Sequence, residues 1–560
     1  MQDISKQRFD VIVVGSGASG GWAAKRLAEA GVKVALLDCG RPQSDQNFTE
    51  HMPAFDLKYR NRIPEVIRRT RPIQKDCYAC TEFNYQWFSN DFDEPYATAP
   101  GTQFSWQGRV RMVGGRTNVW GRVSLRLSDL DLKAASFDGF GADWPLAYKD
   151  LDPYYDLVEE YVGVSGRAEG YPYLPDGKFQ PEMPLNCLEV HFRDRVKAKL
   201  GWIVGPTRTA NITKPLNGRA PCHYCGPCHQ GCVTHSYFNS AFTTVADALA
   251  SGNCTLIPNA MAYKVLMDPD RNRARGILYI DRNTREAKEV EANVVVLSAQ
   301  ALESVRILLN SANRQYPQGL ANSSGVLGHY LMDHVMGGGA TGEFPEQATQ
   351  PTLNGPRRPS GLYVARFRNV PGARSKKFLR GYGFQGGGHS DFDFQAPGFG
   401  AAYKKSILNP LTTIRLGGFG ESLGRWENYV EIDPGLRDTF GIPTLRMHMT
   451  YSENEHAMVQ DMADSAAEML EAAGAKNIRP VMKPSIPGWA IHEVGIARMG
   501  NDPKKTVLNP FLQTHDVKNL FVMDGAGFPS TGCQNPTLTI MALTVRSCDY
   551  LMQEMKTGNI

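Results

Sequence analysis

Four closely spaced cysteines are the clearest candidates for redox or metal chemistry in this chain. Cys222, Cys225, Cys228 and Cys232 follow the spacing C-x2-C-x2-C-x3-C. This is the spacing of the ferredoxin run that binds an iron–sulfur cluster. Structural zinc sites instead use two C-x2-C pairs separated by a longer spacer. The motif therefore predicts an iron–sulfur cluster, with structural zinc or unligated thiols as the alternatives.

Two details leave the cluster type open. In ferredoxins a proline follows the fourth cysteine, whereas Val233 follows Cys232 here. In two-cluster ferredoxins the fourth cysteine serves the other cluster. Three cysteines could thus hold a [3Fe–4S] cluster, or Cys232 could complete a [4Fe–4S] cluster. The neighbouring imidazoles are expected to be exposed loop residues rather than ligands: His223, His229 and His235.

The remaining cysteines carry weaker signals. Cys77 and Cys80 form an isolated C-x-x-C pair whose redox or metal role stays open. The other five are interpreted as small buried hydrophobic residues: Cys39, Cys187, Cys254, Cys533 and Cys548.

A glycine-rich turn near the N-terminus predicts a dinucleotide site. Gly15, Gly17 and Gly20 follow the apolar run 11–14 and open a helix-like stretch, and a second apolar run ends at Asp38. The glycines permit a tight turn, close approach of the backbone to a pyrophosphate, and packing of helix on strand. The helix N-terminus favours the pyrophosphate, and Asp38 lies where a carboxylate binds a ribose hydroxyl. The motif itself does not separate FAD from NAD.

Three C-terminal segments carry residues suited to catalysis. His492 could accept a proton at neutral pH, although a lone histidine is more often structural. Asp524 ends an apolar run and is followed by Gly525, which lets a ligand approach the backbone. Asn535 precedes Pro536 and is expected to cap a helix in which Pro536 is the first residue.

The size and composition of the chain frame these motifs. Its 560 residues exceed one hydrophobic core, so two or more domains are expected. A net charge of +4 and 21% charged residues give no reason to expect nucleic acid as a partner. No run of 18 apolar residues occurs, so no transmembrane segment is expected. The first eight residues show no apolar signal region, which taken alone favours the cytoplasm.

The order of apolar runs and turns predicts a dinucleotide domain assembled from separated segments. A fold of class α/β is expected, with a Rossmann-like domain plus a substrate domain built on a mainly antiparallel sheet. The dinucleotide domain is expected in three parts: 1–150, 241–330 and 486–560. The substrate domain is expected at 151–210 and 331–485, and the cysteine segment at 211–240.

The fingerprint and the three C-terminal segments together resemble the glucose-methanol-choline (GMC) oxidoreductases, flavoproteins that oxidise alcohols with FAD. The resemblance runs nearly end to end. It implies that Gly15, Gly17 and Gly20 cradle the FAD pyrophosphate and that Asp38 binds the adenosine ribose. It also implies that His492 is the catalytic base and that Asn535 is paired with it.

The same resemblance implies further FAD contacts, which lie at Gly114, Gly115, Asn118, Ala262, Asp524, Gly525, Pro536 and Thr537. Some members carry a histidine that links FAD covalently before the aromatic residue of the Gly-Gly loop. Val119 stands there, so non-covalent FAD is expected. Two positions depart from the family pattern: Gln300 replaces a glycine, and Ile496 replaces a threonine.

The cysteine motif is similar to that of bacterial sugar dehydrogenases within this family. That resemblance implies a flavin-bearing large subunit, a small subunit with an export signal, and cytochrome c or another acceptor. It implies oxidation of a sugar or glycoside hydroxyl, with the glucoside 3-hydroxyl, oxidised to a 3-keto-glucoside, as the first choice. Hydride would pass to flavin N5 and electrons through the cluster. By co-export the protein would be periplasmic, the alternative being cytoplasmic.

Several other functions stay open at this point. Glucose, gluconate and fructose dehydrogenases belong to the same branch. An oxygen-using sugar oxidase would need no cluster. A redox-sensing flavoprotein would bind FAD that no sugar reduces, and a zinc-stabilised NAD enzyme would bind no flavin.

Overall fold

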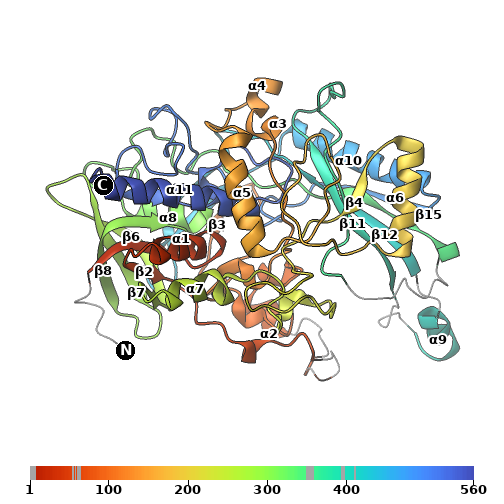
Figure 1. Ribbon diagram of the computed structural model, residues 1–560, viewed down its shortest axis with the longest axis horizontal. Coiled ribbons are helices and arrows are strands. Elements are labelled where there is room, and N and C mark those ends of the chain that lie inside the picture. The colour runs from red at the N-terminus through yellow and green to blue at the C-terminus, as the bar shows by residue number, and fades with distance from the viewer. Residues whose placement is uncertain are drawn as a thin grey trace.

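The computed structural model describes residues 8–52, 56, 58–59, 65–347, 358–391, 398–408 and 411–560. Residues 1–7, on which the expectation of a missing signal region rests, lie outside the described part. The described helices and strands form two main sheets, which lie toward opposite ends of the long axis with helix α5 between them (Figure 1).

The first sheet is the predicted dinucleotide fold. Strand β1 (Phe9–Val14) pairs in parallel with β2 (Val34–Leu37) and with the second half of β8 (Ala287–Leu297). Strand β5 (Cys254–Ile257) adds beyond β2, and β16 (Leu520–Val522) adds in parallel to β8. These runs are rich in Val, Ile and Leu because helices cover both faces of a parallel sheet.

An antiparallel extension continues this sheet, because the first half of β8 pairs with β7 (Ala274–Asp281), which pairs with β6 (Ala260–Met267). The helices of this half contact one another around the sheet: α1 (Ala18–Glu29) packs on α7 (Thr244–Ala250) and α11 (Thr537–Thr557), and α11 packs on α5 (Tyr148–Val162). Helix α8 (Ala301–Asn310) follows β8 directly and packs on β6.

The second sheet is antiparallel, in the order β15-β9-β12-β11-β10-β4. Helix α10 (Glu453–Ala472) packs on three of its strands and on α6 (Cys187–Leu200). Strand β12 alternates buried and exposed residues, as expected for a sheet with one covered face. The bounds are β4 Val204–Pro206, β9 Gly338–Glu343, β10 Leu362–Val364, β11 Tyr382–Asp391, β12 Leu411–Gly420 and β15 Lys476–Met482.

Smaller elements complete the described chain. A third sheet joins β13 (Tyr429–Arg437), β14 (Pro443–His448) and β3 (Ala97–Thr98). The other helices are α2 Glu65–Thr70, α3 Asp129–Leu132, α4 Ala134–Asp138 and α9 Gly400–Leu408. In the described part of the chain, no helix is long and apolar enough to cross a bilayer. The predicted α/β fold, with a Rossmann-like sheet and an antiparallel second sheet, is confirmed.

Candidate active site and cysteine motif

A large cavity opens at the carboxyl ends of the parallel strands, where α/β sheets bind ligands. It encloses about 1710 Å³ of empty space, part of it open to solvent. Its lining brings together most of the residues singled out from the sequence: Gly15, Gly17, Asp38, Gly115, Ala262, His492, Asp524, Gly525, Asn535, Pro536 and Thr537. Three further residues singled out from the sequence lie behind the lining and are not part of it: Gly20, Gly114 and Asn118.

The glycine fingerprint forms a cradle that leaves room for a ligand. A Cβ on Gly15 would lie 2.4 Å from the Ser298 carbonyl oxygen, and one on Gly20 would lie 1.8 Å from the Gly15 carbonyl oxygen. Gly17 differs, because a Cβ there would meet no protein atom within 4 Å. Helix α1 begins immediately after it, so its free N–H groups face the same space. This cradle fits a pyrophosphate.

Asp38 is held by the turn that it faces. Its Oδ2 accepts the Ser16 N–H at 2.9 Å and the Ser16 hydroxyl at 2.5 Å, and its Oδ1 accepts the Gly40 N–H at 2.6 Å. Burial raises the pKa of Asp38, and these hydrogen bonds oppose the shift. Both lone pairs of Oδ2 are engaged, but Oδ1 keeps one free, so the carboxylate can still accept a ribose hydroxyl.

The Gly-Gly loop lies directly against the fingerprint. Gly114 has φ = 90°, and its N–H donates to the Ser16 hydroxyl at 2.8 Å. A Cβ on Gly115 would stand 3.3 Å from the Gly17 Cα. Asn118 is fully buried and donates to the carbonyls of Val113 and Gly115, at 3.0 and 2.9 Å. Asn118 therefore stabilises the loop from behind.

Gln300 shows why a glycine is usual at its position. It takes φ = 79°, the left-handed region that favours glycine, at the residue preceding α8. Its side chain lines the cavity, and its buried Nε2 has no hydrogen-bond partner in the described structure. A buried donor of this kind awaits an acceptor. Ala262 of β6 lines the same cavity.

Asp524 lines the cavity just after β16, at the carboxyl ends of the parallel strands. Its Oδ2 accepts the Ser304 hydroxyl at 2.5 Å, and its Oδ1 accepts the Ala526 N–H at 2.9 Å. Burial raises the pKa of Asp524 to about 6, and those two bonds oppose the shift. Pro536 and Thr537 line the cavity at the start of α11, so that helix also directs its N-terminus toward it.

His492 lines the cavity, and the buried carboxylate of Asp333 holds the backbone of its segment. Asp333 accepts the N–H of Ala490 at 3.0 Å and that of His492 at 2.9 Å. The Nδ1 atom of His492 lies 3.1 Å from Nδ1 of His334. Burial lowers the pKa of His492 well below 6.5, and the charges of His334 and Arg116 act in the same direction. The ring is therefore neutral at pH 7 and can accept a proton.

Asn535 does not have the structural role predicted for it. Helix α11 begins at Thr537 with Pro536 as its N-cap residue, and no side chain caps it. The Asn535 Oδ1 instead accepts the Gln385 amide at 2.7 Å, from strand β11 of the second sheet. With Oδ1 engaged, the Nδ2 amino group is what Asn535 can offer to a bound molecule. Gln385 escaped the sequence analysis because it lies 150 residues away.

An ion pair fixes the segment of His492 to the Gly-Gly loop. Arg116 binds both carboxylate oxygens of Glu493, at 2.7 and 3.0 Å, and donates to the Ile491 carbonyl at 2.9 Å. The Glu493 side chain is only 1% exposed. Because this bidentate pair is buried on the Glu493 side, it restrains His492 relative to the loop.

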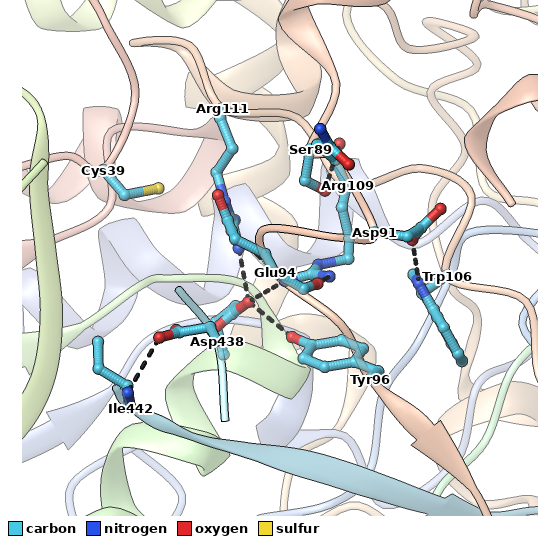
Figure 2. Close-up of polar contacts among 12 residues, drawn as sticks. Cys39, Ser89, Asp91, Glu94, Tyr96, Trp106, Arg109, Arg111, Asp438 and Ile442 are labelled. Atoms are coloured by element: carbon cyan, nitrogen blue, oxygen red, sulfur yellow. Dashed lines mark hydrogen bonds and ion pairs between the residues drawn. The ribbon is translucent and has the colours of Figure 1, made fainter. Parts of the chain in front are cut away.

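A buried ion network borders the cavity (Figure 2). Arg111 contacts Glu94 at 2.6 Å and Glu303 at 2.7 Å, and Arg109 contacts Glu303 at 3.1 Å. The Tyr96 hydroxyl donates to Glu303 at 2.6 Å. Burial alone would raise the pKa of Glu303, but Arg111 and the other arginines hold it well below 4.5.

The cysteine motif forms a loop beside this cavity. Cys228 and Cys232 are buried around Tyr237, whose hydroxyl donates to the Asn118 carbonyl at 2.9 Å. Cys222 and Cys225 are half-buried. Burial, followed by the charges of Cys228 and Cys232, raises the pKa of Cys225 to about 12. Among the described residues, no three of the four sulfurs lie within 4.8 Å of one another.

The histidines near the motif differ in exposure, so the expectation of exposed loop residues is wrong for two of them. His223 is exposed, and its Nε2 lies 2.7 Å from that of His51. His235 is half-buried and bonds Asp45 at 2.8 Å. His229 is also half-buried, and burial lowers its pKa to about 4.

The C-x-x-C pair lies between the cavity and the cysteine motif. Both thiols are buried, and Cys77 lines the cavity. Asn84, from the same segment, donates to the His229 carbonyl at 2.6 Å. Of the cysteines interpreted as buried hydrophobic residues, Cys254, Cys533 and Cys548 are buried, whereas Cys39 and Cys187 are half-buried.

Comparison with known proteins identifies the family. Residues 9–336 and 425–544 match the two models of the GMC oxidoreductases, which together span most of the chain. The chain belongs to the GMC oxidoreductase family. The family implies FAD, and the open space at Gly17 and the unpartnered Gln300 amide of this GMC oxidoreductase fit such a group.

Three relatives match this GMC oxidoreductase over 98% of its chain. 2-Methyl-1,2-propanediol dehydrogenase of Mycolicibacterium austroafricanum is 30% identical, with 96% of its length covered. The fructose dehydrogenase large subunit of Gluconobacter japonicus is 28% identical, with 98% covered. The gluconate 2-dehydrogenase flavoprotein of Pantoea cypripedii is 25% identical, with 94% covered.

Two solved structures share the fold. A formate oxidase of Aspergillus oryzae superposes with a TM-score of 0.63 at 14% identity, over 99% of both chains. Pyridoxine 4-oxidase superposes with a TM-score of 0.60 at 17% identity, over 97% of this chain and 99% of that one.

Proposed function

We propose that this protein is an FAD-dependent dehydrogenase that oxidises a hydroxyl of a sugar or glycoside, with the glucoside 3-hydroxyl as the first candidate. The observation that supports it best is the placement of His492 and Asn535 on one cavity with the glycine cradle. A C-glycoside 3-oxidase of Arthrobacter globiformis, 30% identical over 151 residues, lends support to the 3-position.

Each polar group has a defined task in this proposal. His492 Nε2 accepts the hydroxyl proton, since Nδ1 faces His334. The Asn535 amide donates to the substrate oxygen and holds it in line. FAD, bound non-covalently, would accept the carbon-bound hydrogen as a hydride at N5. The alcohol loses one proton and one hydride, so the product is a ketone.

We also propose that the four cysteines hold an iron–sulfur cluster that carries electrons to an external acceptor. The C-x2-C-x2-C-x3-C spacing, which matches the ferredoxin run, supports a cluster over a zinc site. The named large subunit among the relatives supports a partner subunit. We propose further that this partner is a small subunit with an export signal, that cytochrome c is the acceptor, and that the protein is periplasmic.

A panel of hydroxyl compounds tests the substrate class. Flavin bleaching would be followed anaerobically with lactose, D-glucose, D-fructose, gluconate and 2-methyl-1,2-propanediol. A glucoside is expected to bleach the flavin fastest. Bleaching by the diol alone would instead assign a small-alcohol dehydrogenase, which the 30% identical relative favours. Rapid peroxide formation in air would identify an oxidase.

His492→Ala tests the base. Removing a general base costs about 10²- to 10⁴-fold in rate, so bleaching by the best substrate should slow by that factor while FAD stays bound. Near-normal bleaching in this variant would refute the assignment. Iron and acid-labile sulfide analysis, repeated on Cys225→Ser, tests the cluster separately.

A further inference from the structure

The imidazole of His334 lies behind that of His492, on the side away from the cavity. His334 is fully buried, and the two Nδ1 atoms are 3.1 Å apart. The ring planes meet at 79° with centroids 4.9 Å apart, so the contact is edge-on rather than stacked. A nitrogen–nitrogen contact at this distance is a hydrogen bond, in which one ring must donate and the other must accept.

Both rings are neutral, which restricts the possible proton arrangements. Burial lowers the pKa of His334 to about 4, and the nearby Gly532 backbone opposes part of that shift. Within the described residues, the buried Nε2 of His334 has no partner with hydrogen-bond geometry. A neutral imidazole carries its proton on one nitrogen only. If His492 is the base at Nε2, that nitrogen carries no proton, so the proton of His492 lies on Nδ1 and the His334 Nδ1 must accept it.

We infer that His334 is a positioning residue that fixes the proton of His492 on Nδ1 and leaves the lone pair of Nε2 toward the cavity. This inference rests on the proposed function, because that lone pair is the one that would take the hydroxyl proton. The hydrogen bond then runs from His492, at the cavity, to the buried ring of His334. A buried carboxylate often orients a catalytic histidine; here a neutral imidazole has that place.

The residue before His334 supports the same arrangement through the backbone. Asp333 is fully buried and holds the N–H groups of Ala490 and His492. Met332 and Val494 exchange both backbone hydrogen bonds at 3.0 Å. The segment 332–334 therefore fixes the position of the His492 backbone and, through His334, the tautomer of its ring.

Two substitutions separate hydrogen bonding from packing. His334→Phe keeps a ring in the core but removes the acceptor. His334→Asn places an amide oxygen near the position of the lost Nδ1. We expect His334→Phe to slow flavin bleaching by the best substrate roughly tenfold or more, with FAD content and KM nearly unchanged. His334→Asn should recover most of that rate.

A control and a direct measurement complete the test. His191→Phe removes a histidine that bonds the Ala473 carbonyl at 3.0 Å, outside the cavity lining, and should leave the rate unchanged. Nitrogen-15 shifts of the twelve histidines, with His492 assigned by its loss in His492→Asn, report the tautomer without any His334 variant. A proton on Nδ1 and a bare Nε2 are expected.

Two results would overturn the inference: a His492 proton on Nε2, or a His334→Phe protein that bleaches as fast as the wild type. If no hydroxyl compound bleaches the wild-type flavin, the proposed function fails instead. The tautomer measurement would still decide the role of His334, so the two failures are distinguishable.

Discussion

At the scale of single residues, Gln385 determines which end of the Asn535 amide is free to face the cavity. Its bond to Oδ1 turns the Nδ2 group into the donor. In Gln385→Leu this bond is lost and the amide can flip, presenting an acceptor to the substrate oxygen. We expect kcat to fall roughly five- to tenfold, the cost of about one neutral hydrogen bond. Anaerobic single-turnover kinetics would measure this.

The matched control for this prediction is Gln460→Leu. Gln460 is exposed on α10, where its amide bonds Asp464 at 3.0 Å. The control should keep the wild-type rate. An unchanged rate in Gln385→Leu as well would mean that Asn535 is oriented by something else.

The residue scale also shows where sequence reasoning ended. His492 and Asn535 were found because their own segments carry family patterns. Their partners His334 and Gln385 lie 158 and 150 residues away and carry no local signal. The same distance explains the wrong prediction of an Asn535 cap, since the side chain bonds across to β11 rather than to α11.

At the scale of elements, the turn between β1 and α1 predicts opposite outcomes for two similar substitutions. Gly17 has φ = −67°, which any residue can adopt, and a Cβ there meets no protein atom. Gly17→Ala should therefore fold normally but lose FAD, because the methyl group occupies ligand space. Gly20→Ala should fold poorly, because its Cβ would strike the Gly15 carbonyl.

Circular dichroism and the visible spectrum of each purified variant would check this pair. Normal FAD content in Gly17→Ala would show that the pyrophosphate does not approach the backbone there.

The ion network around α8 predicts a stability effect. Glu303→Gln leaves Arg109 and Arg111 without a full counter-charge, which should lower the free energy of unfolding by about 3–5 kcal/mol. The folded-state pKa of Glu303 lies below its unfolded value. The ionised carboxylate therefore contributes stability above about pH 4.5, and this contribution is lost as the pH falls through the folded-state pKa.

Guanidinium unfolding at pH 7 and again at acid pH would measure both effects. The variant should differ from the wild type at pH 7 and approach it at the lower pH. Glu291→Gln breaks an exposed pair with Arg275 and should cost less than about 1 kcal/mol. Equal losses in the two variants would contradict a special role for the buried network.

The sequence predicts a helix well where its buried apolar residues recur at the helical period. The spacing of apolar residues predicts one helix over 301–310 and another over 454–474. The structure forms α8 over Ala301–Asn310 and α10 over Glu453–Ala472. Both carry apolar residues at helical spacing and clear ends. The left-handed backbone at Gln300 could not be foreseen, because a glutamine rarely adopts it and only the packing of β8 against the fingerprint requires it.

At the scale of the whole molecule, the proposed catalytic site takes residues from both sheets. His492 and Asn535 lie on the side of the parallel sheet, whereas Gln385 comes from the antiparallel one. The glycine cradle, His492 and Asn535 line one cavity, although 520 residues separate Gly15 from Asn535. The proposed catalytic centre therefore forms only when the full fold is assembled.

The visible absorption spectrum of the purified protein, before and after anaerobic addition of lactose, tests the central claim most directly. The account predicts flavin bands over a broad iron–sulfur absorption, and bleaching of the flavin bands on addition. A protein that remains colourless after reconstitution with FAD would contradict it.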